Sequence, residues 1–153
     1  PSFPTRRSSD LQAEGSNPVN RAYRNKKDEF DYIAPKTLAD SISVGIPRNG
    51  YKALNALKES KGIAVDVSDK EILNAMTVLA RHTGVFGEPA GVTAFAGLMK
   101  LSNAKAIGPD ESVAFIVSGS GLKDVKSAQM AVTKPEKMKP QLDLLIKYFE
   151  KNK

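Results

Sequence analysis

The feature that most constrains the fold is a compact apolar run, VAFIV at residues 113–117, followed at once by the turn SGSG at residues 118–121. So short an apolar run without polar alternation predicts a strand that is buried on both faces. Such strands belong to open α/β sheets, in which ligands bind beyond the carboxyl ends of the strands. Small residues let a ligand approach the backbone, and a serine hydroxyl can hydrogen-bond it. We therefore predict a ligand-binding turn at residues 118–121.

Two familiar glycine-rich motifs do not account for this turn. A dinucleotide fingerprint would need a third glycine where the chain has Asp124. A phosphate-binding P-loop would need serine or threonine after its lysine, but Lys123 is also followed by Asp124. The ligand of the turn must therefore be sought elsewhere.

The composition predicts a single soluble domain without a metal site. The 153 residues are 41% hydrophobic and 26% charged, which is ordinary for a globular protein with a real core. No apolar run approaches the roughly 18 residues needed to cross a bilayer, so we expect no membrane partner. The chain has no cysteine and one histidine, which excludes a disulfide scaffold and a thiolate or histidine-rich metal site. We expect a cytoplasmic protein.

About half of the net charge of +6 arises from residues 134–153, which contain six lysines and only three acidic residues. Apolar residues in this segment recur at positions i, i+3, i+4 and i+7, which predicts a terminal amphipathic helix with lysines on its solvated face. A nucleic-acid-binding surface would combine basic with aromatic residues on one face. We therefore expect no nucleic-acid partner, and we assign the apolar stripe to a core or subunit contact. The stripe consists of Leu142, Leu145, Ile146 and Phe149.

Four further elements can be predicted from local patterns. Residues 51–60 read as a helix and residues 63–67 as a short strand. The clearest helix begins at Ser68, which forms a capping box with Glu71 and is followed by apolar residues at helical spacing up to Gly84. A further helix begins at Glu88-Pro89, and its small residues form a thin face. That face suits either tight packing on a sheet or the wall of a cofactor pocket. The small residues are Ala90, Gly91, Ala94 and Gly97.

Five blocks of this chain, in order, resemble segments of the threonine synthases, which are pyridoxal-phosphate enzymes of the tryptophan-synthase-β fold group. Any one block is a weak signal, but together they extend over most of the chain. The blocks are QAEGSNP at 12–18, TLADSISVGIP at 37–47, SDKEIL at 68–73, GVFGEPAG at 84–91 and SGSGLKD at 118–124.

The resemblance implies an α/β fold: the carboxyl-terminal part of a tryptophan-synthase-β-type enzyme, with a parallel-rich sheet flanked by helices. It implies pyridoxal 5'-phosphate as cofactor, with Ser118 and Gly119 as cofactor-binding residues and the Ser118 hydroxyl at the ring nitrogen. The family usually has threonine at this place. Segment 39–42 would line the substrate side of the pocket.

The family's Schiff-base lysine and its phosphate-binding glycine loop belong to upstream motifs that this sequence does not contain. Lys123 is no substitute, because the family has a lysine at that place as well as the catalytic one. We therefore expect a carboxyl-terminal fragment that carries no catalytic residue and is inactive alone. Residues 3–11 look like a translated sequencing-library adapter, so residues 1–11 are expected to be an artefact. Residues 12–133 would then belong to the catalytic domain, and residues 134–153 to the terminal helix.

The resemblance implies that the full-length enzyme converts O-phospho-L-homoserine and water into L-threonine and phosphate, as a homodimer. A sister enzyme of the same scaffold, such as a cysteate synthase or a threonine dehydratase, remains an alternative. So does a non-catalytic binding module that kept this half of the fold.

Overall fold

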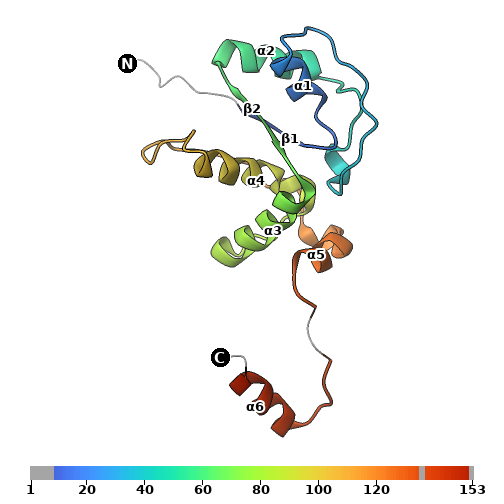
Figure 1. Cartoon of the computed structure of the whole chain (residues 1–153), viewed down its shortest axis with the longest axis vertical. Helices are drawn as coiled ribbons and strands as arrows, with labels where there is room; N and C mark the ends of the chain where they lie inside the picture. Colours follow the sequence, from blue (N-terminus) through green and yellow to red (C-terminus); the bar gives the residue numbers. More distant parts are fainter. Residues whose placement is uncertain (1–8, 135–136, 152–153) are drawn as a thin grey trace.

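The computed structural model describes residues 9–134 and 137–151, which form a layered body and a separate terminal helix (Figure 1). Within these ranges, no helix is long and apolar enough to cross a membrane. In chain order, the elements are β1 (Ser9–Ala13), α1 (Pro18–Arg24), the 3-10 helix η1 (Asp40–Ile42), α2 (Gly50–Ser60), β2 (Ile63–Val67), α3 (Asp69–Thr83), α4 (Pro89–Asn103), the 3-10 helix η2 (Gly121–Lys123), α5 (Val125–Ala131) and α6 (Leu142–Lys151).

The centre of the body is a parallel pair of strands, β1 and β2, in which Leu11 pairs with Val65 and Ala13 with Val67. Helices α1 and α2 lie on one side of the pair, and α3 and α4 lie on the other (Figure 1). The main core fills the side of α3 and α4, where Val67, Ile72 and Met76 are fully buried. The predicted α/β class, with a parallel sheet flanked by helices, is confirmed.

The thin face of α4 allows this helix to lie directly on β1. A Cβ atom added at Gly97 would be only 2.4 Å from the Leu11 side chain, so with a larger residue either that side chain or α4 would have to move. Of the two uses considered for the thin face, sheet packing therefore accounts for Gly97.

Local sequence signals predicted the boundaries of α3 correctly. The Ser68 hydroxyl accepts a hydrogen bond from the Glu71 N–H at 3.3 Å, and the Glu71 carboxylate accepts one from the Ser68 N–H at 2.6 Å. Gly84 ends the helix with φ = 74°, a left-handed conformation that favours glycine. The predicted apolar face, which includes Ile72 and Met76, is buried.

The predicted strand at residues 113–117 was wrong in this structure. The segment is extended, and its Phe115 ring lies 5.3 Å from the Phe95 ring of α4, but Ile116 on the opposite face is 80% exposed. A strand requires a neighbour for its ladder of hydrogen bonds. Among the described residues the only sheet is the β1–β2 pair, and it does not extend to this segment.

Helix α1 is less solvated than the charged sequence after Asn20 suggests, because its first turns are buried against β2. Asn20 is fully buried, and its amide donates hydrogen bonds to the Val65 carbonyl at 2.9 Å and to Asp66 at 2.6 Å. The Asn17 amide donates to the other oxygen of Asp66 at 2.7 Å. Local sequence patterns do not predict this polar contact between α1 and β2.

Residues 9–11 form the first part of β1, although residues 1–11 were expected to be an artefact. Residues 1–8 lie outside the described part of the chain. The expectation that residues 1–11 are foreign to the protein stays a prediction.

Removal of the α3 cap should destabilise the chain. We expect Ser68→Ala to lower the free energy of unfolding by about 1 kcal/mol, because an amide at the helix start loses its partner. Chemical denaturation at neutral pH measures the change. The exposed Ser102, which lies inside α4, provides the matched control, and Ser102→Ala should leave the midpoint unchanged.

The capping box should also weaken in acid. Burial acts to raise the pKa of Glu71, but hydrogen bonds from Ser68 and Lys100 outweigh it and hold the pKa below its ordinary value of 4.5. The contribution of the Glu71 carboxylate to stability is therefore complete above that value and is lost as the pH falls below it. An equal loss at pH 7 and at pH 3 for Ser68→Ala would contradict this account.

Asp10 should have the opposite pH dependence. Its carboxylate has a buried oxygen without a hydrogen-bond partner among the described residues. Desolvation by burial, and then repulsion from Asp66, raise its pKa to about 6. Because the charged form is disfavoured in the folded chain, its contribution to stability is present below the ordinary value of 3.8 and is lost as the pH rises to about 6.

We therefore expect Asp10→Asn to raise the free energy of unfolding at pH 8 by about 2 kcal/mol and to have little effect at pH 3. Denaturation curves at the two pH values measure the difference. The control is Asp110→Asn at an exposed position, which should change neither curve.

Candidate functional site

The predicted ligand-binding turn is held in place by the segment before α4. The Glu88 N–H donates to the Gly119 carbonyl at 2.9 Å, and the Gly121 N–H donates to the Phe86 carbonyl at 2.9 Å. Gly87 and Ser120 form an antiparallel bridge between the two segments. Two of the five blocks, 84–91 and 118–124, thus meet in space although more than 25 residues separate them in the sequence.

Glycine is required at Gly119 because the turn lies directly on Glu88. A Cβ atom at Gly119 would be 2.0 Å from a Glu88 carboxylate oxygen and 2.7 Å from its Cγ atom, so the buried Glu88 side chain or the turn would have to move. A Cβ atom at Gly91 would be 2.9 Å from the Gly119 nitrogen. The thin face of α4 therefore has two uses. Near the start of the helix, Gly91 lets the turn lie close, and further along, Gly97 lets β1 lie close.

Glu88 is a buried carboxylate that supports the turn. It is 9% exposed and, although it stands at the start of α4, its side chain makes no cap hydrogen bond to that helix. Its carboxylate instead lies 3.7 Å from the Lys123 ammonium. Glu88 therefore contacts the segment after Ser118 at two places. Its N–H donates to the Gly119 carbonyl, and its carboxylate lies beside Lys123.

Lys123 shows none of the surroundings of an activated lysine. Its side chain is 69% exposed and is paired with a carboxylate, whereas activation requires desolvation or a neighbouring cation. Every lysine that the structure describes is exposed. That the chain carries no catalytic residue stays a prediction.

The Ser118 hydroxyl is free to bind a ligand. Ser118 is exposed, and its side chain makes no hydrogen bond to any described residue. The neighbouring Ser120 has a structural role, because its hydroxyl accepts a hydrogen bond from the Leu122 N–H at 3.3 Å. Asp124 likewise accepts from the Ser127 N–H at 3.0 Å and so caps α5. Of the two serines in the turn, only Ser118 has a hydroxyl that no described residue already binds.

Segment 39–42, which was expected on the substrate side, forms η1 and contacts α4. Ala39 is fully buried, whereas Asp40 and Ser41 are exposed. The Ser16 hydroxyl donates to the Ile42 and Val44 carbonyls at 3.3 and 3.0 Å, which ties this segment to the end of β1. No group of three or more acidic or histidine side chains that could hold a metal ion is found in the described parts of the chain.

Comparison with known proteins identifies the family. A family model described as pyridoxal-phosphate dependent enzyme matches residues 4–119. The chain belongs to this family. The cofactor predicted from the sequence, pyridoxal phosphate, is thereby confirmed.

The curated relatives include threonine synthases. That of Methanocaldococcus jannaschii is 40% identical over 136 residues, which are 88% of this chain and 34% of that protein. The threonine synthase of Methanosarcina acetivorans is 38% identical with the same coverage. The chain spans about a third of the length of these relatives. The resemblance found in the sequence is confirmed.

Solved structures with the same fold include two serine racemases. The maize enzyme aligns over 95% of this chain and 38% of its own, with a TM-score of 0.62 and 16% identity. The enzyme from Dictyostelium discoideum aligns over 74% of this chain and 34% of its own, with a TM-score of 0.56 and 20% identity. At these identities the likeness confirms the fold alone.

The residues of the turn fit one edge of pyridoxal phosphate. The free hydroxyl of Ser118 can hydrogen-bond a ring nitrogen, and the absence of a side chain at Gly119 lets the backbone of the turn lie directly on Glu88. The assignment of Ser118 and Gly119 as cofactor-binding residues stays a prediction that this geometry supports.

We expect Gly119→Ala to disrupt the turn, because the new methyl group would collide with the buried Glu88. The free energy of unfolding should fall by about 1–3 kcal/mol, the usual cost of overpacking. Chemical denaturation measures it, with Gly108→Ala as control, because a Cβ atom there would meet nothing closer than 3.6 Å. Equal effects of the two substitutions would refute the tight contact.

Proposed function

We propose that this chain is the carboxyl-terminal part of a threonine synthase, which converts O-phospho-L-homoserine and water into L-threonine and phosphate. The observation that carries the proposal is the turn at residues 118–121, which is fixed by Glu88 and leaves the Ser118 hydroxyl free. Support for the particular reaction comes from the relatives, because threonine synthases match 88% of the chain at 38–40% identity.

In this proposal, the chain supplies one wall of the cofactor site. When bound, pyridoxal phosphate supplies the electron sink for the reaction. Ser118 holds the ring nitrogen with a neutral hydroxyl, which orients the ring without placing a negative charge beside it. Glu88 and Lys123 keep the turn in position, and α4 lies against it at Gly91.

The chain alone should be inactive, because the Schiff-base lysine and the phosphate-binding loop of the family belong to upstream motifs that this sequence does not contain. The full-length enzyme is proposed to be a cytoplasmic homodimer without nucleic-acid or membrane partners. Residues 12–133 would belong to its catalytic domain, and residues 134–153 to a terminal helix.

The test is an assay of the full-length protein encoded by the gene, with pyridoxal phosphate and O-phospho-L-homoserine. We expect release of phosphate and threonine in equal amounts, and neither product from the 153-residue chain alone. Threonine breakdown, or formation of cysteate, in place of threonine release would identify a sister enzyme instead. Failure of the full-length protein to bind the cofactor would support the non-catalytic module.

Variants of Ser118 in the full-length protein separate its role from a general effect on folding. Ser118→Ala removes the hydroxyl and should lower activity by about tenfold or more, as expected for the loss of one ligand hydrogen bond. Ser118→Thr retains the hydroxyl and should stay active. The absorption spectrum of the bound cofactor provides a second readout, and an unchanged spectrum in Ser118→Ala would contradict the contact.

A further inference from the structure

Glu88 carries a buried charge that the proposed cofactor contact does not use. Its carboxylate accepts no hydrogen bond from any residue that the structure describes. Its one partner among these residues is the Lys123 ammonium, at 3.7 Å. Buried carboxylates are costly unless they are paired or hydrogen-bonded. A buried polar group with so few partners needs an explanation, and a role in ligand binding is one of them.

The Glu88 carboxylate lies against the residue that follows Ser118. A Cβ atom at Gly119 would be 2.0 Å from one carboxylate oxygen and 2.2 Å from the carboxyl carbon, so the carboxylate rests directly on the backbone of the turn. The Glu88 N–H also donates to the Gly119 carbonyl at 2.9 Å. The negative charge is therefore placed one residue from the hydroxyl that is proposed to hold the ring nitrogen of the cofactor.

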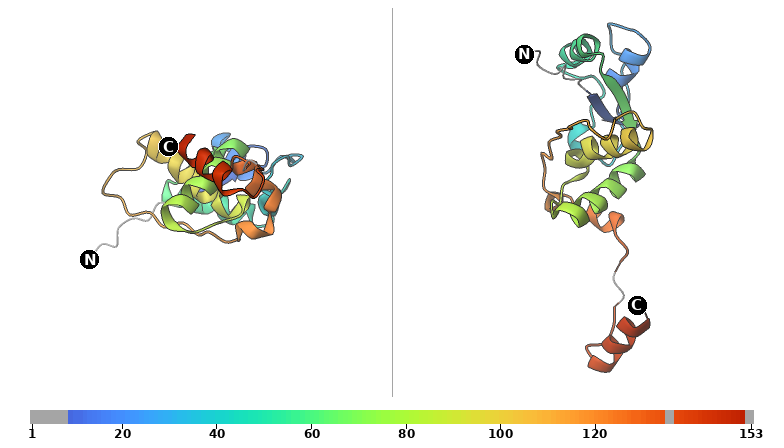
Figure 2. Two further views of the ribbon diagram at one scale, coloured as in Figure 1. Left: turned by 90° about the horizontal axis from the view of Figure 1, so that it is seen from below. Right: turned by 90° about the vertical axis from the view of Figure 1, so that its left-hand side faces the viewer.

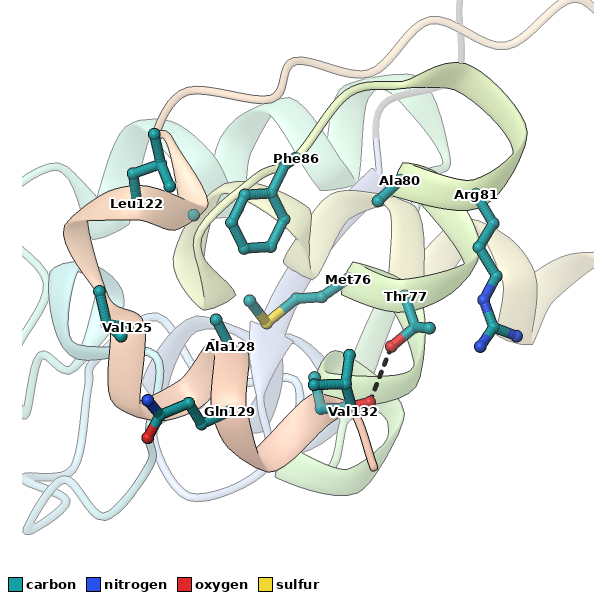
Figure 3. Close-up of a pocket in the computed structure, with 12 residues that line it drawn as sticks. Met76, Thr77, Ala80, Arg81, Phe86, Leu122, Val125, Ala128, Gln129 and Val132 are labelled. Atoms are coloured by element: carbon teal, nitrogen blue, oxygen red, sulfur yellow. Dashed lines mark hydrogen bonds between the residues drawn. The ribbon is translucent and has the colours of Figure 1, made fainter. Parts of the chain in front are cut away.

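Lys123 is brought to this carboxylate by η2, which is anchored to the same segment. The Gly121 N–H donates to the Phe86 carbonyl at 2.9 Å, and a Cβ atom at Gly121 would be 2.6 Å from the Phe86 ring. Figure 3 shows this ring directed into the pocket between α3 and α5, which ties η2 to the body. One short segment of the chain therefore carries Glu88 and also holds the element that presents Lys123.

The two charges face each other without a hydrogen bond. At 3.7 Å, the Lys123 ammonium and the Glu88 carboxylate are beyond hydrogen-bond distance but well within the range of charge attraction. The Lys123 side chain is 69% exposed, whereas that of Glu88 is 12% exposed. Lys123 thus offsets the charge of Glu88 from the solvent side and leaves the space above the turn free.

The other charged groups around the turn have partners of their own or lie in water. The Asp124 carboxylate accepts from the Ser127 N–H at 3.0 Å and lies near Lys126, at the start of α5. Asp40 of η1, which contacts α4, is exposed.

The charges further from the turn are also solvated. Arg81 and His82 in the last turn of α3 are exposed. Helix α6 with its lysines stands apart from the body (Figure 1 and the right-hand view of Figure 2). Water and salt screen exposed charges at a distance. Glu88 and its partner Lys123 are therefore the pair that sets the charge at the turn.

We propose that Glu88 and Lys123 form a balanced pair of charges that keeps the ring nitrogen of the cofactor neutral. The Ser118 hydroxyl can donate to a neutral nitrogen and does not by itself favour its protonation. An unbalanced carboxylate one residue away would favour the protonated, positively charged ring, because opposite charges attract. Lys123 removes that bias by offsetting the charge of Glu88.

The charge on the ring nitrogen tunes the cofactor as an electron sink, so the pair acts on the chemistry from outside the reacting centre. Glu88 and Lys123 are positioning residues in this account, because they act through the turn. The inference rests on the proposed contact between Ser118 and the ring nitrogen.

The test uses the full-length protein loaded with pyridoxal phosphate that carries an isotope label on its ring nitrogen. The magnetic resonance signal of this atom, followed over a range of pH, distinguishes the protonated from the neutral nitrogen. Lys123→Gln leaves Glu88 unbalanced and should raise the pKa of the ring nitrogen by at least about half a pH unit. Glu88→Gln should lower this pKa or leave the nitrogen neutral throughout, and the double variant should titrate like the parent protein.

Two control variants separate charge from shape. Lys126→Gln removes a neighbouring lysine that lies beside Asp124 instead of Glu88, and it should leave the pKa of the ring nitrogen unchanged. Lys123→Arg retains the charge and should behave like the parent protein. Because Lys123 and Lys126 are both exposed, none of these substitutions should unfold the protein.

Three results would overturn the proposal. If Lys123→Gln leaves the pKa unchanged while Ser118→Ala alters the signal, the cofactor contact holds but the pair does not act on it. If Lys123→Gln and Glu88→Gln both raise the pKa, they act by distorting the turn. If Ser118→Ala also leaves the signal unchanged, or the protein binds no cofactor, the proposed contact fails and the pair fails with it. A protein that shows the expected shifts but forms no threonine would support the pair and contradict the proposed reaction.

Discussion

The contact between the backbone of Gly119 and the buried carboxylate of Glu88 is the constraint on which the site depends. It joins a loop near the end of the body to the first turn of α4, and α4 in turn lies on β1 through Gly97. The position of the Ser118 hydroxyl is therefore fixed relative to the central strands by glycines that allow close approach. Because backbone hydrogen bonds hold this turn, the Ser118 hydroxyl is not needed to stabilise it and stays available to a ligand.

Features that depend on neighbouring residues could be predicted from the sequence. The capping box of Ser68 and Glu71, the left-handed Gly84 and the span of β2 each follow from a few adjacent residues. The turn at residues 118–121 was found because small residues and hydroxyls are grouped there. Its role came from the resemblance, since neither charge nor spacing within the turn identifies a ligand.

Features that depend on distant partners could not be predicted. The segment 113–117 has the composition of a buried strand, but a strand exists only where another strand lies beside it, and the sheet of the described chain does not reach it. The burial of Asn20 could not be predicted either, because its partner Asp66 lies 46 positions further along the chain. The support that Glu88 gives to Gly119 was likewise hidden, because both residues suit several other roles.

Because every lysine in the described chain is exposed, the reactivity of each lysine amine reports whether the surface around it is open to solvent. A reagent that modifies primary amines would reach these lysines in the isolated chain without entering the core. When another protein surface covers part of the molecule, the lysines beneath it would lose their reactivity while the remainder keep theirs. Lys123 reports on the turn beside Glu88, and Lys147 reports on α6, so one labelling pattern distinguishes a surface that covers the turn from one that covers the terminal helix.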